Sequence, residues 1–357
     1  MSHAEAQKLI DELIETVEHE HASDLHISVG RKPLIRVAGY LVPLVNKEVI
    51  TKAVMEGMMS VLMTEENLER FAEDKEIDFS YAHKRDVRFR GNGFVRQGAI
   101  SIALRHIPKD ISTLADLALP PILEEFAMKQ QGFFLVVGPV GQGKTTTLAS
   151  MIEIINQNRA EHIVTIEDPV EYVYEQKKSV IDQREVRVDT DSFATALRSV
   201  FRQDVDVLLI GEMRGLETIS AAVTAAETGH LVFSTLHTNN ASQTIDRIID
   251  SFPSAQQSQI RLQLASSLSG IFSQRLIPRV SGGLVPAYEL LINTNAVSNL
   301  IREQRSHEIN TVIETGSEHG MIDMNRSLVE LVEAGEITIE SAQAYSFNPD
   351  TLTRMLK

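Results

Sequence analysis

The sequence has no cysteine, and this absence already narrows its chemistry. It excludes a disulfide framework, a cysteine-ligated zinc site and a thiol nucleophile. Long apolar runs are also missing, because the run around 133–137 is far shorter than the roughly 20 residues that span a bilayer. The first 21 residues are acidic and amphipathic and lack the basic and apolar regions of a secretory signal. We therefore expect a cytoplasmic protein with no direct membrane insertion, which reaches a membrane only through partners.

Basic residues are few relative to acidic ones. Lys and Arg number 34, whereas Asp and Glu number 49, which gives a formal net charge of −15. No global basic field is available to hold nucleic acid, so we expect no nucleic-acid partner unless a local basic groove provides one. Apolar residues make up 43% and charged residues 23%, as in soluble globular proteins, and 357 residues are enough for two domains.

Residues 1–107 are predicted to form a compact α+β domain. Apolar residues recur at helical spacing near the N-terminus, and short alternating runs separated by Gly and Pro follow. The last stretch, 77–107, is typical of an antiparallel meander. The expected helices are 4–20, 51–62 and 65–73, and the expected strands before the meander are 25–28, 33–39 and 41–45.

Residues 108–121 begin and end with proline and contain few large core residues, so they are predicted to be a linker. In 122–357, short, continuous, β-branched runs alternate with helical stretches. This pattern predicts an α/β domain with a doubly wound parallel sheet that is buried on both faces. From about residue 256 onward, the pattern indicates a mostly helical region. The expected strands are 133–138, 162–168, 205–212 and 230–237, and the expected helices are 144–157, 191–203 and 215–228.

One stretch matches the phosphate-binding pattern G-x-x-x-x-G-K-[ST] in full, after a predicted strand and at the start of a predicted helix. Its glycines let the loop expose consecutive backbone N–H groups toward phosphate oxygens, with the positive end of the helix behind them. Lys144 is expected to reach the β- and γ-phosphates, and the Thr145 hydroxyl is expected to bind Mg²⁺. The expected nucleotide-binding residues are Gly138, Pro139, Val140, Gly141, Gln142, Gly143, Lys144, Thr145 and Thr146.

Carboxylates end two further predicted strands. Glu212 ends one of them, and from there it is expected to orient or deprotonate the water that attacks a γ-phosphate. Many P-loop enzymes keep an Mg²⁺-binding Asp at the position where this chain has Gly211. Either the metal depends on Thr145 and water, or another acid helps. Glu167 and Asp168, which end another predicted strand, are the candidates.

Histidines stand at both ends of the predicted strand 230–237. An imidazole can donate to a γ-phosphate oxygen or hydrogen-bond a catalytic carboxylate, so His230 and His237 are predicted to be functional. A second, earlier group matches no recognised zinc spacing and predicts no metal site: His19, His21, His26 and Asp24.

Four segments resemble, in order and spacing, the nucleotide motifs of the type II/type IV secretion ATPase superfamily. They correspond to its Walker A loop, Asp box, atypical Walker B and His box, and they are 138–145, IEDPVEY (166–172), LLIGEMRGLET (208–218) and GHLVFSTLHTN (229–239). Further segments resemble the pilus retraction (twitching motility) ATPases within this superfamily. They are 22–27, IDFSYA (77–82), RFRGNGF (88–94), 296–303 and 320–325.

This resemblance implies a PAS-like N-terminal domain and a RecA-like ATPase domain in 122–357. It implies a homohexamer that hydrolyses ATP, with Mg²⁺, at subunit interfaces and powers type IV pilus retraction. The expected partners are an inner-membrane platform protein and the pilus machinery, which would place the ring at the inner face of the cytoplasmic membrane. In the family, arginines of the N-terminal domain complete the catalytic site. The best matches are Arg88, Arg90 and Arg105, and Arg198 and Arg202 are weaker candidates.

Three positions depart from the family pattern. Ser298 stands where the retraction signature has Arg, Gly215 where Asp is usual, and Val205 where Pro is usual. None of them belongs to the phosphate loop, so ATP hydrolysis is still expected, but Ser298 leaves an accessory retraction paralogue as an alternative. A pilus assembly or type II secretion ATPase is a further alternative. The lack of cysteine counts against it, because those proteins typically carry a tetracysteine metal site.

Three interpretations outside this family are also open to test. A nucleic-acid motor is disfavoured by the net charge of −15. A guanine-nucleotide switch is disfavoured because the only Asn-Lys pair, Asn46-Lys47, precedes the phosphate loop, so the usual downstream Asn-Lys-x-Asp is missing. An inactive ATP-binding scaffold would be excluded by measurable turnover.

Overall fold

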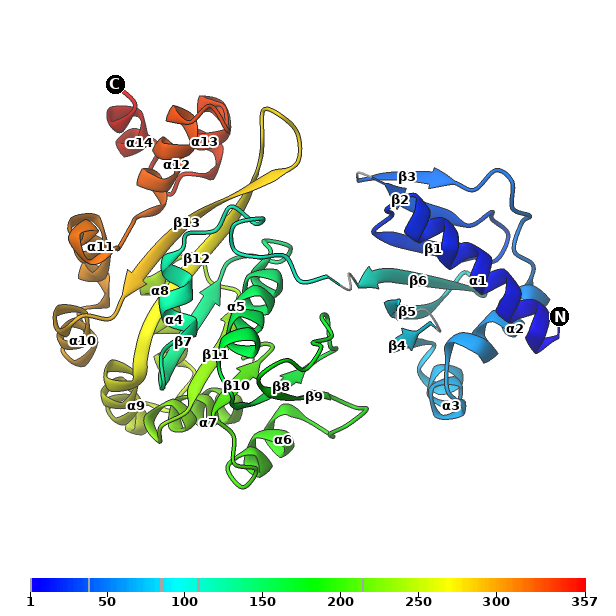
Figure 1. Cartoon of the computed structure of the whole chain (residues 1–357), viewed down its shortest axis with the longest axis horizontal. Coiled ribbons are helices and arrows are strands. Elements are labelled where there is room, and N and C mark those ends of the chain that lie inside the picture. The colour runs from blue at the N-terminus through cyan, green and yellow to red at the C-terminus, as the bar shows by residue number, and fades with distance from the viewer. Residues whose placement is uncertain (1, 38, 84–86, 108–109, 214) are drawn as a thin grey trace. The chain divides into compact units, whose positions relative to one another are not determined.

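The structure is a computed structural model that describes residues 2–37, 39–83, 87–107, 110–213 and 215–357. It divides into two compact units, Met1–Asp110 and Ile111–Lys357 (Figure 1). The division falls inside the predicted linker 108–121, whose first two residues lie outside the described ones. Leu114 and Leu119 are buried in a core of the second unit, so the later part of this segment packs there. A hinge role for the segment stays a prediction.

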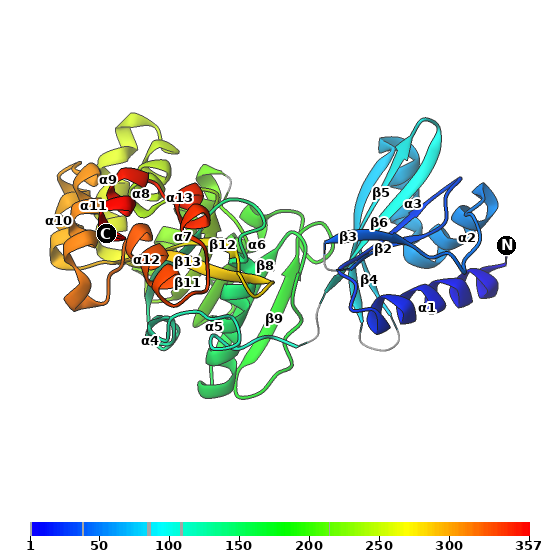
Figure 2. The same cartoon turned by 90° about the horizontal axis from the view of Figure 1, so that it is seen from above.

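The first unit contains an antiparallel sheet of six strands in the order β3-β2-β1-β6-β5-β4. Three helices pack against this sheet, and Figure 2 shows α1 lying along one side of it. All of the helices and strands predicted before residue 107 are present, with small shifts at their ends. The strands are β1 (Asp24–Ser28), β2 (Leu34–Val37), β3 (Tyr40–Pro43), β4 (Glu76–Ala82), β5 (Arg88–Arg96) and β6 (Ala99–Ile107), and the helices are α1 (His3–His19), α2 (Lys52–Leu62) and α3 (Glu65–Asp74).

The N-terminal sheet has one apolar and one polar face, because side chains alternate along each strand. Its apolar face includes Leu25, Phe89 and Leu104, which are packed in one core with residues of the three helices. On the other face, Asp24 of β1 lies directly opposite Arg105 of β6. An antiparallel sheet tolerates such a polar face, since only one of its faces must be covered.

The second unit is a mixed α/β structure built on a sheet of seven strands in the order β13-β12-β7-β11-β10-β8-β9. Each neighbouring pair is parallel except β12 with β13, which is antiparallel. The strands are β7 (Gly132–Val137), β8 (His162–Glu167), β9 (Val180–Glu185), β10 (Val207–Ile210), β11 (Leu231–Leu236), β12 (Leu268–Pro278) and β13 (Leu284–Ile292).

Both faces of this sheet are buried, as the continuous apolar runs predict. In β7, Phe133 and Leu135 belong to one core, whereas Phe134 and Val136 belong to another. Helices α6 to α9 contribute to the first core, and α4 and α5 contribute to the second. These helices are α4 (Ile122–Ala127), α5 (Lys144–Asn158), α6 (Phe193–Val200), α7 (Leu216–Glu227), α8 (Ala241–Asp250) and α9 (Ser254–Ser267).

The prediction of a mostly helical region after residue 256 is wrong for 268–292. Here β12 and β13 form a long hairpin that extends the sheet (Figure 1). Its apolar runs are short and flanked by turn residues, and such runs are ambiguous between helix and strand. Gly282 and Gly283 have φ of 93° and 77°, which is the left-handed region that hairpin turns demand. Strand β9, at the sheet edge, was also not predicted.

Helices do form the rest of the C-terminal region, and Figure 1 shows them beyond the β12–β13 hairpin. Ser298, the departure noted above, is buried in α10. Its hydroxyl donates to the carbonyl oxygen of Ala265 on α9, 2.8 Å away, so the short side chain fixes this helix pair. The helices are α10 (Asn295–Arg302), α11 (Ile309–Thr315), α12 (Met324–Glu333), α13 (Ile339–Tyr345) and α14 (Pro349–Met355), with 3₁₀ turns at Ser306–Glu308 and Ser317–His319.

Candidate functional site

The predicted site residues of the second unit, apart from His230, lie where four neighbouring parallel strands end. The strands β7, β11, β10 and β8 are adjacent, and their carboxyl ends therefore meet at one edge of the sheet. Ligands of open α/β sheets bind at this edge. The segments that follow or end these strands are the phosphate loop after β7, His237 after β11, Glu212 after β10 and Glu167 in β8.

The phosphate loop adopts a backbone that only glycine accepts easily. Gly141 and Gly143 have φ of 76° and 75°, and Gly143 is the N-cap residue of α5. Helix α5 begins at Lys144, so the N–H groups of its first turn face the loop. The Lys144 ammonium donates to the carbonyl oxygens of Gly138 and Pro139, 2.8 and 2.7 Å away. The main chain of the loop therefore binds the ammonium group of Lys144.

Lys144 occupies an environment that weakens its charge. The side chain is buried, and this burial lowers the pKa of its ammonium to about 8, although Glu212 and Glu171 act in the opposite direction. An anionic ligand placed beside the ammonium would restore its charged form. The site therefore offers a cation whose protonation is coupled to anion binding.

His237 joins Lys144 to Glu212. Its Nδ1 lies 3.3 Å from the Lys144 Nζ, and its Nε2 lies 3.6 Å from the Glu212 Oε2. The His237 side chain is half-exposed, whereas the Glu212 side chain is 16% exposed. The structure therefore brings together one cation, one imidazole and one carboxylate from three adjacent strand ends, as the sequence predicts.

Glu167 is more deeply buried than Glu212. Burial raises the pKa of its carboxyl to about 7, even though the Thr165 hydroxyl donates to it from 2.6 Å. Gly211 follows the neighbouring strand, and a Cβ there would lie 3.4 Å from the Glu167 Cα. The glycine that replaces the usual Asp therefore lies against Glu167. Asp168 instead pairs with Arg187 at 3.5 Å.

The two threonines after Lys144 have different surroundings. Thr145 is half-buried in the first turn of α5, where an N-terminal hydroxyl can reach a bound metal. Thr146 hydrogen-bonds the Tyr172 hydroxyl at 2.9 Å, which links the helix to the segment after Glu167. Tyr172 was not predicted, and its only signal in the sequence is its place within IEDPVEY.

His230 is not brought to this group. It precedes β11, at the end opposite His237, and the six residues of the strand separate the two histidines by roughly 20 Å. Its Nδ1 lies 2.9 Å from the carbonyl oxygen of Ala225, and its ring packs edge-on against Phe201. These contacts are those of a structural histidine at the amino end of the sheet. A catalytic role for His230 stays a prediction.

The three N-terminal arginines lie on the polar face of the first sheet. Arg90 of β5 is the cross-strand partner of Arg105 of β6, and Arg88 shares its face because it lies two residues before Arg90. The Arg105 Nε lies 3.1 Å from an Asp24 carboxylate oxygen, and its side chain is 70% exposed. The two strands therefore carry all three arginines on the same face of the sheet.

Gln274 and Thr147 contact the phosphate loop but were not predicted. Gln274 lies in β12, so the helical interpretation of this region hid it. Its amide Nε2 donates to the carbonyl oxygen of Gln142 at 2.8 Å, and its Oε1 accepts from the Thr147 hydroxyl at 2.7 Å. Prediction of a strand beside the phosphate loop would have indicated Gln274. A buried polar side chain on such a strand needs a hydrogen-bond partner, and the loop is the nearest one.

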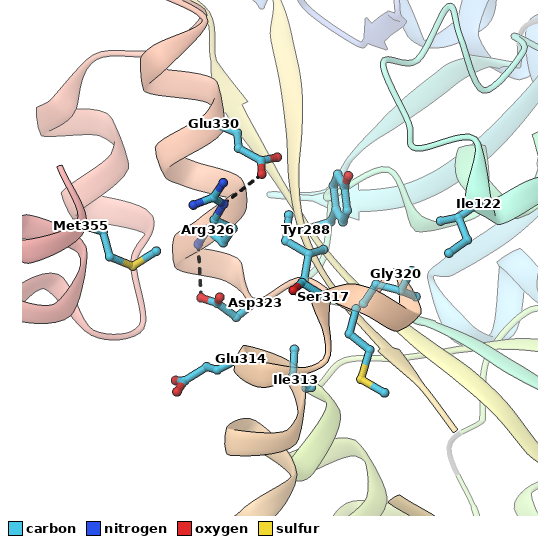
Figure 3. Close-up of a pocket in the computed structure, with 13 residues that line it drawn as sticks. Ile122, Tyr288, Ile313, Glu314, Ser317, Gly320, Asp323, Arg326, Glu330 and Met355 are labelled. Carbon is cyan, nitrogen blue, oxygen red and sulfur yellow. Dashed lines mark hydrogen bonds and ion pairs between the residues drawn. The ribbon is translucent and has the colours of Figure 1, made fainter. Parts of the chain in front are cut away.

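A cavity of about 590 Å³ lies elsewhere in the second unit, between β13, α4 and the C-terminal helices (Figure 3). Tyr288 and Met321 line it, together with the Arg326–Glu330 ion pair of 3.1 Å. None of the predicted nucleotide-binding residues lines this cavity. The volume is thus separate from the strand ends that carry the candidate chemistry.

Membrane-spanning helices and clusters of metal-binding side chains are both absent from the described residues. No described helix is long and apolar enough to cross a bilayer. Within the same residues, no cluster of three or more His, Cys, Asp or Glu side chains has the arrangement of a metal site.

Comparisons with known proteins agree with the motif-based resemblance. A sequence model of the family "Type II/IV secretion system protein" matches residues 1–346. The chain is 41% identical over 346 residues to the type IV pilus retractation ATPase PilT of Pseudomonas aeruginosa, covering 96% of this chain and 99% of that one. It is 37% identical over 348 residues to the type IV pilus ATPase PilU of the same organism, covering 97% and 91%.

A solved structure has the same fold. The crystal structure of the pilus retraction motor PilT with bound ADP superposes with a TM-score of 0.90 at 44% identity, covering 98% of this chain and 99% of that one. The resemblance drawn from the four nucleotide motifs is therefore confirmed. The chain belongs to the type II/IV secretion system protein family.

Proposed function

We propose that the chain is a hexameric ATP-hydrolysing motor that powers type IV pilus retraction. The observation that carries this proposal is the grouping of Lys144, His237 and Glu212 at the ends of adjacent parallel strands. The family membership and the likeness to the PilT proteins support it, since those relatives are described as retraction ATPases and a retraction motor.

ATP binds with its phosphates in the loop 138–146. The backbone N–H groups of the loop and of the first turn of α5 donate to phosphate oxygens. Lys144 leaves the carbonyl oxygens of Gly138 and Pro139, which hold it in this structure, and pairs with the β- and γ-phosphates. These loop carbonyls therefore stand in for the ligand, and an ammonium already directed into the loop fits a polyphosphate.

The residues present also fit Mg²⁺. Thr145 supplies a half-buried hydroxyl at the start of α5, and the Glu167 carboxylate would supply oxygen at the end of β8, on the same edge of the sheet. Mg²⁺, when bound, would neutralise charge on the phosphate oxygens. Because Gly211 has no side chain, either Thr145 and water suffice or Glu167 assists, as the sequence suggests.

Glu212 acts on the water that attacks the γ-phosphate. It is the less buried of the two carboxylates, and His237 lies between it and Lys144, so the imidazole can hold the carboxylate and donate to a phosphate oxygen. Glu167 is the alternative base. Its pKa, raised by burial to about 7, means that only about half of these carboxyls are ionised at pH 7.

Arginines of a neighbouring copy complete the site. A guanidinium stabilises the charge that spreads over the γ-phosphoryl oxygens in the transition state. Arg88, Arg90 and Arg105 are the candidates, because they lie on the same polar face of the N-terminal sheet. This proposal includes a PAS-like first unit, a RecA-like second unit and a homohexamer. Rotation of one unit against the other, with 108–121 as hinge, would drive the work.

The partners and place of action follow from the same proposal. The motor acts at the inner face of the cytoplasmic membrane, against an inner-membrane platform protein and the pilus machinery. An accessory retraction paralogue is the second candidate, supported by the 37% identity to PilU over nearly the whole chain. A pilus assembly or type II secretion ATPase remains the third.

The catalytic proposal is tested by Lys144→Ala. Since Lys144 is the cation that the loop holds, the variant should lose ATP binding or turnover, measured as Mg-ATP affinity and phosphate release. Wild-type activity in this variant would refute the phosphate-loop assignment.

Complementation distinguishes the biological roles. The gene should restore twitching to a retraction-deficient strain, and its deletion should leave piliated cells. Restoration that depends on a second motor would support the accessory role, whereas bald cells after deletion would support an assembly ATPase.

A further inference from the structure

Strand β12 extends past the strand that leads into the phosphate loop. Ser273 of β12 pairs with Val137, the last residue of β7, and β12 then continues to Pro278. The edge of β12 beyond Ser273 therefore has no β7 residue beside it. The phosphate loop, which follows Val137, occupies this space.

Two glutamines connect the loop to this edge, and the side chain of each bonds to the main chain of the other's segment. The Gln274 amide Nε2 donates to the main-chain carbonyl of Gln142 at 2.8 Å. The main-chain N–H of Leu276 donates to the Gln142 side-chain Oε1 at 2.6 Å. Gln142 thus takes the place that a further residue of β7 would have beside β12, and its side chain faces the sheet edge.

The same Gln274 amide also holds the start of α5. Its Oε1 accepts from the Thr147 hydroxyl at 2.7 Å, and that hydroxyl lies 3.1 Å from the Gly143 carbonyl oxygen. Gln274 is 3% exposed and Thr147 is 1% exposed, so water cannot replace either partner easily. One buried side chain therefore fixes both the loop and the helix that together receive the phosphates.

Residue 274 also packs closely against two glycines of the phosphate loop. A Cβ at Gly143 would lie 3.0 Å from the Gln274 Nε2, and a Cβ at Gly138 would lie 2.5 Å from the Gln274 carbonyl oxygen. Both glycines belong to the G-x-x-x-x-G-K-[ST] pattern. Part of the demand for glycine at these positions comes from β12 rather than from a ligand.

We propose that Gln274 is a positioning residue that holds the phosphate loop in its nucleotide-binding shape, through the Gln142 carbonyl and the Thr147 hydroxyl. This proposal rests on the proposed role of the loop in ATP binding. Gln274 does not touch the reacting atoms. It acts by fixing the loop from β12, outside the four nucleotide motifs, so that the N–H groups and Lys144 meet the phosphates without rearrangement.

The test is Gln274→Met, which keeps the length of the side chain and removes both amide hydrogen bonds. In the assembled full-length protein, the dissociation constant for Mg-ADP and the KM for ATP should rise about tenfold, with kcat little changed, because the loss affects ground-state binding. A purely structural role would lower the thermal midpoint and the active fraction, hence the apparent kcat, and leave KM unchanged.

Two further variants test the positioning role of Gln274 independently of Gln274→Met. Gln274→Glu retains an acceptor for Thr147 and loses the donor to Gln142, so it should also raise KM, and it serves if the Met variant does not fold. The double variant with Gln142→Met should cost little more than the larger single effect, since the pair acts as one unit. The matched control is Gln263→Met on α9, whose amide donates to Glu227, and its KM should stay at the wild-type value.

Lys144→Ala separates this inference from the proposed function. If that variant loses ADP binding while the Gln274 variants bind as wild type, the positioning role is refuted and the function stands. If Lys144→Ala itself binds normally, the nucleotide site is elsewhere and both proposals fail.

Discussion

The N-terminal sheet is antiparallel and keeps charged side chains on one face, whereas the C-terminal sheet is mostly parallel and buries both faces. The parallel sheet can therefore display polar groups only where its strands end, and there it places Lys144, His237 and Glu212. The antiparallel sheet can display them along a strand, as it does with Arg90 and Arg105. In the proposed function, the strand ends of the parallel sheet hold the phosphates, and the polar face of the antiparallel sheet supplies arginines to a neighbouring copy.

The largest effect is expected from Glu212→Gln, which tests the group of side chains at the strand ends of the parallel sheet. The variant should bind ATP but hydrolyse it about 10²- to 10⁴-fold more slowly, because the amide cannot act on the attacking water. Single-turnover phosphate release and Mg-ATP affinity, measured on the same sample, check this. Glu318→Gln, which alters an exposed carboxylate of the same unit, is the control. Unchanged turnover in the Glu212 variant would move the role to Glu167.

The arginine face is tested by comparing Arg105→Ala with Arg36→Ala. Both guanidinium groups lie close to the Asp24 carboxylate, at 3.1 and 3.6 Å, so each change removes one ion pair of the same carboxylate. Only Arg105→Ala should lower kcat, by about 10²-fold, which is less than the loss of a single arginine finger because three arginines share the face.

Rings assembled from two different variants test whether the arginine comes from a neighbouring copy. A ring that combines Arg105→Ala with Lys144→Ala subunits contains interfaces with an intact loop and an intact arginine, so partial activity should return. The same mixing applies to Arg88 and Arg90. Absence of recovery at every mixing ratio would argue against an arginine supplied by a neighbouring copy.

Glu289 is a buried carboxyl of the C-terminal sheet that lies away from the strand ends of the candidate site. Its effect on the free energy of unfolding shows how much a charge costs there. Burial raises the pKa of this β13 carboxyl to about 7 from its ordinary value of 4.5, although it accepts from the Ala241 N–H. The group's contribution to folding is therefore intact below about pH 4.5 and is lost as pH rises to about 7. Glu289→Gln should raise the free energy of unfolding by about 2 kcal/mol at pH 8 and by less at pH 5.

Denaturant unfolding at the two pH values measures this difference. The exposed Glu318→Gln variant should show none of it. An equal gain from Glu289→Gln at both pH values would show that the carboxyl is ionised in the folded protein at pH 5.

The smallest expected effect concerns Lys144. Because the pKa of the free ammonium is lowered to about 8 and phosphate favours its charged form, ADP binding should take up a proton above pH 8 and none at pH 7. Affinity should fall by up to about tenfold between pH 8 and pH 9. Calorimetric titration in buffers of different protonation enthalpy measures the uptake, and an uptake of zero across this range would contradict the lowered pKa.

The sequence predicts where Lys144, Glu212 and His237 lie, because each of them follows the end of a predicted strand. The apolar runs before Gly138, Glu212 and His237 are continuous and short, which marks buried parallel strands, and the residues that follow them meet at one edge. The same reasoning does not distinguish His230, which lies at the amino end of β11, from His237 at the carboxyl end, and a catalytic role for His230 stays a prediction.

The hairpin is the part that the sequence pattern does not reveal. Runs such as 268–278 carry Ser, Gln and Arg among apolar residues, so they match neither strict alternation nor a helical stripe. The turn at Gly282 and Gly283 was the available signal. Missing it also hides Gln274, whose importance depends on which strand lies beside β7, a matter of tertiary pairing rather than local pattern.

The close approach at Gly138 limits how this chain can be re-engineered. The atom that a Cβ would meet is the main-chain oxygen of residue 274, so no substitution at 274 can make room for a side chain at 138. Gly141 has open space around its missing Cβ, but its φ of 76° still disfavours any side chain, whereas Val140 is 80% exposed. Redesign of the phosphate loop should therefore start at Val140 and leave its glycines as they are.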